Sequence, residues 1–184
     1  AEVTTSVLHG QPKGRTGYAV GNSYTTCTVD SGSGAITRQV NFGASTSTNL
    51  VKSTADWLGR QITEVRPGWN GSDVTRSWFY NNSGQLYKAS QPGLADTLYE
   101  YDTLGVLSRE CLDVGANGAI DLASGDRITE HGWTFFSSGG NWWRRETTGT
   151  YATAGSGTAT QTAKVETQLS GFPAAGGGYT RLAR

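Results

Sequence analysis

The chain contains few charged and few hydrophobic residues, and these two shortages narrow the classes of protein to which it can belong. Charged residues make up 16% of the 184 residues and hydrophobic residues 35%, both low for a globular protein. Fifteen basic residues balance fifteen acidic ones, and they are scattered rather than gathered into the basic patch typical of nucleic-acid binding. The apolar runs are too short to span a membrane. We therefore expect neither nucleic-acid binding nor membrane insertion.

The chain also lacks the short motifs of the common enzyme classes. It contains no GxSxG nucleophile elbow, no HExxH zinc motif, no phosphate-binding loop and no CxxC pair. Of its two histidines, His9 has no ligand-type neighbour. His131 has Asp126 and Glu130 nearby, but strand alternation directs both carboxylates away from the face of His131. The sequence therefore predicts no catalytic residues, no cofactor and no metal site, and a protein that is not an enzyme.

What the chain does contain is typical of β-structure. It has 26 glycines, an excess of Thr and Ser, and 19 aromatic residues, namely six Trp, eight Tyr and five Phe. Thr is β-branched and favours strands, whereas Gly and Ser favour turns. The aromatic content excludes a disordered chain. No run of apolar residues follows helical spacing, so an all-β fold is expected.

A repeat occupies the middle of the chain. Residues 101–107, with the sequence YDTLGVL, echo residues 80–86, with the sequence YNNSGQL, at an offset of 21 residues. Weaker copies begin at Asp56 and Asp30. The shared turn positions of these copies are Asp30, Gly34, Asp56, Gly59, Tyr80, Gly84, Tyr101, Asp102 and Gly105. A second glycine follows nine residues after each of the first three turn glycines, at Gly43, Gly68 and Gly93.

Each copy of the repeat predicts one β-hairpin. An Asp or Asn side chain accepts hydrogen bonds from backbone N–H groups two residues on, which opens a tight turn. The following glycine closes the turn at a position that favours positive φ, and the second glycine makes the next turn. The expected fold is thus an antiparallel meander of repeated hairpins, forming one domain over residues 1–184 with recognisable repeats over about 24–130.

The remaining residues, 131–184, keep their β character but lose the repeat phase. Residues 133–136 and 142–148 predict two strands around a turn at 137–141, and residues 160–169 predict another. Alternation places Trp142 and Trp143 on opposite faces of one strand. These two are candidates for stacking on a ligand, although packing on the sheet is the leading expectation for the six tryptophans.

The meander also bears on the two cysteines, Cys27 and Cys111. They fall on strands about seven apart, and at ~4.8 Å per strand this separates them by ~33 Å, well beyond disulfide reach. Two free, packed thiols are expected.

The motif around Tyr101, Asp102, Gly105 and Leu107 resembles the YD repeat, or RHS repeat, of bacterial RHS proteins, toxin-complex shell subunits and teneurins. Two copies depart from it: one has Asn81 in place of Asp, and the Gly59 copy has Ala in place of Tyr. The resemblance implies a curved β-sheet that forms the wall of a hollow shell, in a secreted or cell-surface bacterial protein.

We therefore expect a non-catalytic structural module that serves in encapsulation or surface interaction. Its partners would be neighbouring repeats of a longer chain, or another protein, paired with the open edges of the sheet. The alternative is a carbohydrate-binding or adhesive β-module that uses exposed Trp and Tyr side chains to bind glycans. An exposed aromatic row on one sheet face would favour this alternative.

Overall fold

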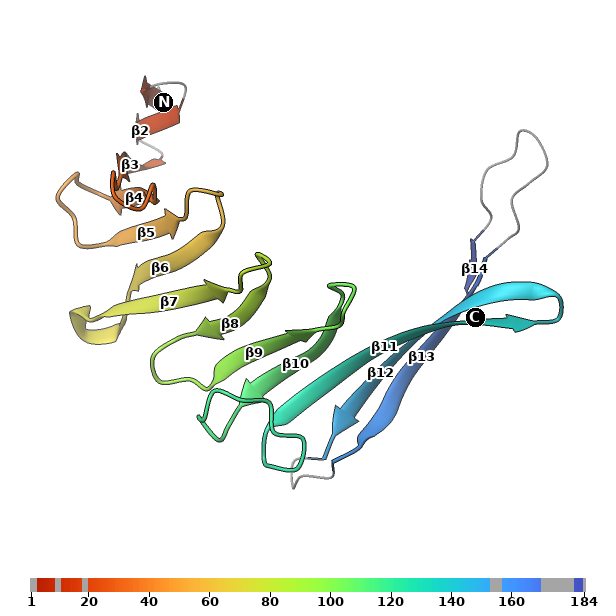
Figure 1. Ribbon diagram of the computed structural model, residues 1–184. Helices are drawn as coiled ribbons and strands as arrows, with labels where there is room; N and C mark the ends of the chain where they lie inside the picture. Colours follow the sequence, from red (N-terminus) through yellow and green to blue (C-terminus); the bar gives the residue numbers. More distant parts are fainter. Residues whose placement is uncertain (1–2, 9–10, 18–19, 153–156, 170–180, 184) are drawn as a thin grey trace, which may run out of the picture. The chain divides into compact units, whose positions relative to one another are not determined.

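The computed structural model describes residues 3–8, 11–17, 20–152, 157–169 and 181–183 (Figure 1). Within these ranges the chain is all-β, which confirms the expected fold class. Its strands form one antiparallel meander in chain order, each strand beside those that precede and follow it. One 3-10 turn, Trp69–Gly71, interrupts the described strands, and no α-helix occurs among them. The composition of residues 154–157 predicts a loop and that of residues 174–178 a flexible segment, but these residues fall largely or wholly outside the described ranges.

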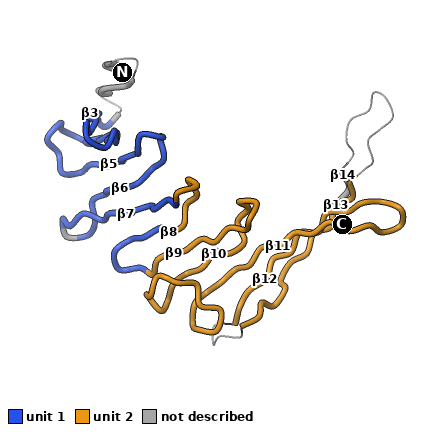
Figure 2. The backbone as a smooth tube through the Cα atoms, viewed as in Figure 1, with its two compact units in different colours: residues 1–81, 89–94 blue, residues 82–88, 95–184 orange. Residues whose placement is uncertain are grey.

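The strands are bounded as follows, in sequence order: β1 (Val3–Leu8), β2 (Gln11–Gly17), β3 (Val20–Val29), β4 (Ile36–Phe42), β5 (Leu50–Ala55), β6 (Gln61–Pro67), β7 (Asp73–Tyr80), β8 (Leu86–Ser90), β9 (Asp96–Tyr101), β10 (Leu107–Asp113), β11 (Arg127–Ser138), β12 (Asn141–Tyr151), β13 (Ala159–Leu169) and β14 (Arg181–Ala183). Contacts divide the chain into two compact units. Unit 1 comprises residues 1–81 and 89–94, and unit 2 comprises residues 82–88 and 95–184 (Figure 2).

The four turn glycines of the repeat lie in the connections that follow β3, β5, β7 and β9. Their φ angles are positive, at 70° for Gly34 and 81° for Gly59, Gly84 and Gly105. An L-residue with a side chain rarely adopts this conformation, because Cβ then crowds the backbone carbonyl. Glycine at these positions therefore lets the chain reverse and pair with the strand it has just left.

The aspartates of the repeat hold these turns together. Asp56 Oδ1 accepts hydrogen bonds from the backbone N–H groups of the residues two and four positions later, both at 2.9 Å. Asp102 Oδ1 repeats this pattern with the same offsets, at 2.8 and 2.9 Å. Asp30 accepts from the N–H groups of Gly32 and Ser33 instead. One side chain thus satisfies the N–H groups that the turn leaves unpaired.

The glycines of the second set do not all adopt the same backbone conformation. Gly43 and Gly93 have φ of 89° and 80°, as expected of turn residues. Gly68 does not: its φ is −100°, and Gly71, three residues later, has φ of 76°. Gly68 is instead fixed by close packing, since a Cβ there would lie 2.6 Å from the Ser72 carbonyl oxygen. The prediction that Gly68 is equivalent to Gly93 was wrong, because a 3-10 turn over Trp69–Gly71 moves the positive φ of this connection to Gly71.

A small apolar core lies in unit 2. Leu98, Cys111, Ile128 and Tyr151 come from four successive strands, β9 to β12, and all four are buried. Cys111 is directly opposite Leu98 on one side and Ile128 on the other, so these side chains share one face of the sheet. Three half-buried residues pack against this cluster: Ile120, Leu122 and Ala159.

Two buried carboxylates shape the connection between β10 and β11. Asp113 and Asp126 are each 1% exposed. Asp113 accepts hydrogen bonds from the backbone N–H groups of Asn117 and Gly118, at 3.2 and 2.8 Å. Asp126 accepts from three N–H groups, those of Val114, Gly115 and Asp121. These bonds compensate for the loss of hydration that burial imposes on a carboxylate.

Candidate functional site

The tyrosines of the repeat join each hairpin to the one before it. Tyr80 Oη donates to the Gln61 carbonyl oxygen at 2.9 Å, and Tyr101 Oη donates to the Leu86 carbonyl oxygen at 2.8 Å. Both tyrosines lie four residues before their turn glycine, and both acceptors lie two residues after the preceding turn glycine. The same hydrogen bond is therefore made twice, in the same repeat phase.

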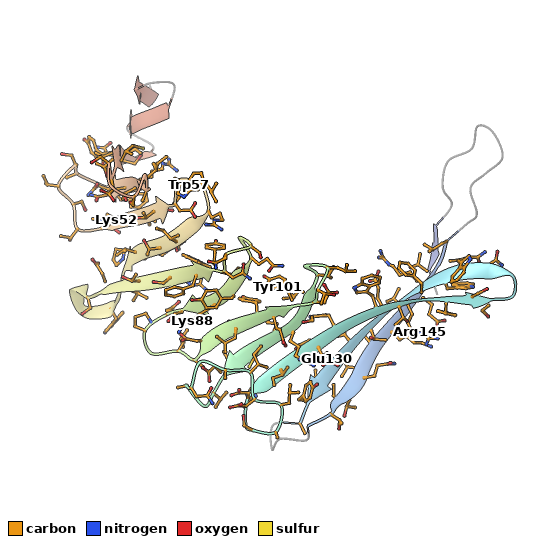
Figure 3. The ribbon with its side chains drawn as sticks, viewed as in Figure 1. Lys52, Trp57, Lys88, Tyr101, Glu130 and Arg145 are labelled. Atoms are coloured by element: carbon orange, nitrogen blue, oxygen red, sulfur yellow. The ribbon has the colours of Figure 1, made fainter. Side chains whose placement is uncertain are left out.

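In both joints, the residue directly after the preceding turn glycine adds a second contact. The Arg60 guanidinium lies 4.6 Å from the centre of the Tyr80 ring, a cation–π arrangement. Gln85 Nε2 donates to the Gly105 carbonyl oxygen at 3.3 Å. Figure 3 shows Tyr101 on β9, where burial raises the pKa of its phenol. We refer to these paired contacts as the inter-repeat joints.

The Gly59 copy of the repeat has no tyrosine with which to form a joint. Ala55 occupies the tyrosine position and lies opposite Ile36. A hydrogen bond of 3.0 Å between the hydroxyls of Thr37 and Thr54 links the same pair of strands. The departure from the YD motif at Ala55 thus coincides with a different cross-strand contact.

A polar cluster in unit 2 was not predicted from the sequence. The Arg109 guanidinium on β10 binds the Glu100 carboxylate at 2.8 Å and the Glu130 carboxylate at 2.9 Å. The Tyr151 hydroxyl donates to the same Glu130 at 2.9 Å. These bonds raise the pKa of the Arg109 guanidinium, the Glu100 bond most. The cluster ties together strands β9 to β12.

One face of the β11–β12 hairpin has its aromatic side chains covered. Phe136 and Trp143 stack with ring centres 6.5 Å apart, and Trp143 is only 9% exposed. The Arg145 guanidinium lies 4.5 Å from the centre of the Phe136 ring and forms an ion pair with Glu166 of β13 at 2.8 Å. We call this the covered face.

The opposite face of the same hairpin is open. It carries Trp133 and Phe135 of β11 and Trp142 of β12, because Trp142 lies directly opposite Ser137. Phe135 is 52% exposed and Trp142 60% exposed. We call these three residues the aromatic row. Of the two predicted stacking candidates, Trp142 therefore lies on the exposed surface and Trp143 on the covered face.

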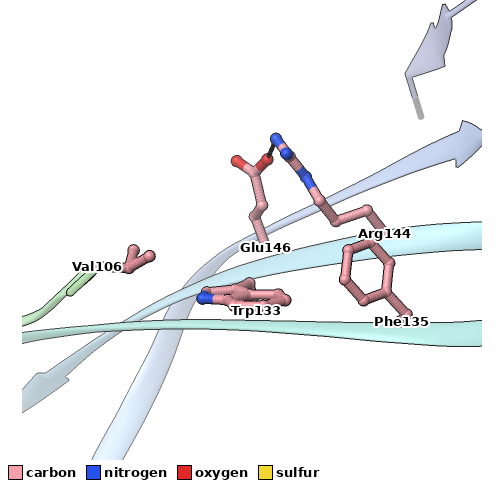
Figure 4. Close-up of a pocket in the computed structure, with 5 residues that line it drawn as sticks. All are labelled: Val106, Trp133, Phe135, Arg144 and Glu146. Atoms are coloured by element: carbon pink, nitrogen blue, oxygen red, sulfur yellow. Dashed lines mark hydrogen bonds and ion pairs between the residues drawn. The ribbon is translucent and has the colours of Figure 1, made fainter. Parts of the chain in front are cut away.

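Two residues of the aromatic row, Trp133 and Phe135, line a hollow of about 340 Å³. Trp133 and Phe135 meet edge to face in it, with ring centres 5.3 Å apart and planes inclined by 75°. Figure 4 shows the Arg144–Glu146 ion pair beside these rings, and Val106 on the side of Trp133 opposite Phe135. The lining is almost entirely apolar.

Two predictions about packing were only partly right. Trp57 and Trp69 of unit 1 are 72% and 90% exposed, and Trp142 is also exposed, so half of the six tryptophans are mainly exposed to solvent. Cys27 and Cys111 are both free, but Cys27 is exposed and only Cys111 is buried. Trp57 and Trp69 lie in turns between strands, and for Trp142 and Cys27 alternation specifies the side of the strand but not whether that side is covered.

No group of three or more His, Cys, Asp or Glu side chains in the described ranges is arranged to hold a metal ion. No helix among the same residues has the length and apolar character needed to cross a membrane. A scan of protein-family models found none that matches this chain, and a search of curated proteins found no match either.

Proposed function

We propose that the chain is a non-catalytic structural module: a segment of β-sheet wall from a secreted or surface protein similar to the YD-repeat family. In such a wall each hairpin serves as the docking surface for the next. The observation that carries the proposal is the recurrence of the inter-repeat joint, with Tyr80 and Tyr101 bonded to equivalent carbonyl oxygens.

A joint that recurs in sequence phase makes the sheet extendable. Each hairpin contacts only its neighbours, so the stability of such an array is close to a sum of repeat and interface contributions. A compact binding domain cannot be extended in this way, because added strands would disrupt its single core. Tolerance of an extra repeat therefore distinguishes the two kinds of protein.

The test is to insert a second copy of residues 81–101 directly after Tyr101. The insertion preserves both existing joints and creates a third, because the new tyrosine again precedes a turn glycine by four residues. We expect a folded protein, a larger urea m-value because more surface is buried, and a maximum dimension longer by about 10 Å, the width of two strands. Aggregation or an unchanged m-value would contradict the proposal.

The matched control replaces only the inserted tyrosine by phenylalanine. This substitution removes one hydroxyl and leaves the ring, so it should lower the free energy of unfolding by about 0.5–1.5 kcal/mol relative to the parent insertion. In the natural chain, Tyr80→Phe and Tyr101→Phe should each cost a similar amount and add in the double variant. The Tyr24 hydroxyl makes no hydrogen bond within the described residues, so Tyr24→Phe should lower the free energy of unfolding by less than either of these substitutions.

A further inference from the structure

The two faces of the β11–β12 hairpin differ in how far their aromatic rings are covered. On the covered face each aromatic ring has a partner: Trp143 stacks on Phe136, and Arg145 lies over Phe136. On the other face Phe135 and Trp142 keep more than half of their surface exposed. Exposed aromatic surface of this extent on one face of a strand pair is typical of a binding surface.

The side chains of the aromatic row follow one another along the hairpin. Trp133 and Phe135 are two residues apart on β11, and Trp142 lies at the level of Ser137, two residues further on. At about 3.4 Å per residue, their backbone positions are separated by roughly 6.8 Å along the strand, and the rings of Trp133 and Phe135, which meet edge to face, have centres 5.3 Å apart. An extended ligand lying along the hairpin can therefore reach all three side chains.

The charges around the hollow limit the chemistry of the ligand. The Arg144 guanidinium is paired with the Glu146 carboxylate, so the rim has no net charge. A cationic ligand would meet a carboxylate that is already neutralised, and an anionic one an apolar lining that cannot solvate it. A neutral ligand with one apolar face and hydroxyl groups at its edge suits both the rings and the rim, since the ion pair offers donors and acceptors side by side.

We propose that the aromatic row binds a neutral, linear oligosaccharide whose pyranose rings carry equatorial substituents. Such rings present a flat C–H face that stacks on an aromatic ring, and β-1,4 linkage keeps the chain extended. One sugar ring lies against Trp133 in the hollow, with its hydroxyls at Arg144 and Glu146, and the chain continues past the Phe135 ring to Trp142. This site goes beyond the proposed wall function and does not depend on it.

The test uses the full chain and three soluble probes: cellohexaose, chitohexaose and maltohexaose. Calorimetric titration should show binding of at least one of the two extended β-1,4 probes, and weaker binding of maltohexaose, whose α-1,4 chain coils. Trp142→Ala should weaken binding roughly tenfold, as expected for loss of a stacked ring. Because Trp142 is exposed, this variant should retain the fold.

The control variant is Trp57→Ala, which removes a tryptophan of unit 1 that is even more exposed than Trp142 and should leave the affinity unchanged. Equal loss in both variants would indicate non-specific stacking and overturn the proposal. Absence of binding by both β-1,4 probes would also overturn the proposal. This holds even if light scattering showed that copies of the chain associate through this face. Failure of the repeat insertion would bear on the wall function alone, since the aromatic row lies outside the inserted residues.

Discussion

A comparison of two glycines in unit 1 tests whether positive φ is what the repeat turns require. Gly59 has φ of 81°, and a Cβ added there would meet no atom within 4 Å. Gly21, in strand β3, also has open space around it but an ordinary φ. Substitution by alanine at these two positions thus differs in backbone conformation and not in steric contact.

The expected magnitudes follow from the two conformations. At Gly59 the left-handed conformation of an alanine lowers the free energy of unfolding by about 1–2 kcal/mol. The reduced entropy of the unfolded chain offsets about 0.4–1 kcal/mol of this loss. The net loss should be about 1 kcal/mol. At Gly21 only the second effect operates, so Gly21→Ala should stabilise by about 0.5 kcal/mol or more.

Urea denaturation followed by tryptophan fluorescence measures both free energies of unfolding, and coincident transitions by circular dichroism check two-state behaviour. Gly59→Asn serves as a further control, because asparagine tolerates positive φ better than alanine and should lose less. If Gly59→Ala and Gly21→Ala shifted stability by the same amount and sign, the turn would not require positive φ and the reasoning would fail.

Two further predictions concern titratable groups in the described residues. Cys27 is exposed, whereas burial raises the pKa of the Cys111 thiol to about 12. A disulfide reagent such as DTNB should therefore modify one thiol per native chain and two after unfolding. Rapid modification of both thiols in the native chain would contradict the buried position of Cys111. Burial tends to raise the pKa of Asp126, but hydrogen bonds from the N–H groups of Asp121, Gly115 and Val114 outweigh it and lower the pKa below 3.8. Because the pKa of Asp126 is lower in the folded than in the unfolded protein, its ionised carboxylate stabilises the fold above the unfolded-state pKa, and this stabilisation is lost as pH falls through the folded-state pKa. The urea midpoint should therefore decline below about pH 3.8. The decline should be steeper than in Asp126→Asn.

The turns and the meander could be predicted from the sequence because their causes are local. Asp102 reaches N–H groups only two and four residues ahead, and the conformation of Gly105 depends on its own lack of a side chain. Repetition of such a turn about every 25 residues leaves few arrangements other than consecutive antiparallel hairpins.

The joints and the aromatic row could not be predicted in the same way. The Tyr101 hydroxyl bonds to a carbonyl 15 residues earlier, and that partner depends on how adjacent hairpins align. Alternation separates Trp142 from Trp143, but it does not specify which of the two is covered. That outcome depends on Arg145 and Glu166, which lie on neighbouring strands and meet only in the folded sheet.

Strand pairing in chain order also has a consequence for how the protein is made. Each strand pairs with the strand that leaves the ribosome just before it, so forming each new pair requires closing only the short loop between them. The entropy lost in closing a loop grows with its length, and folds rich in local contacts form fastest. The sheet can therefore grow strand by strand during synthesis, and each finished hairpin offers its free edge to the next strand within seconds of translation at about 5–20 residues per second.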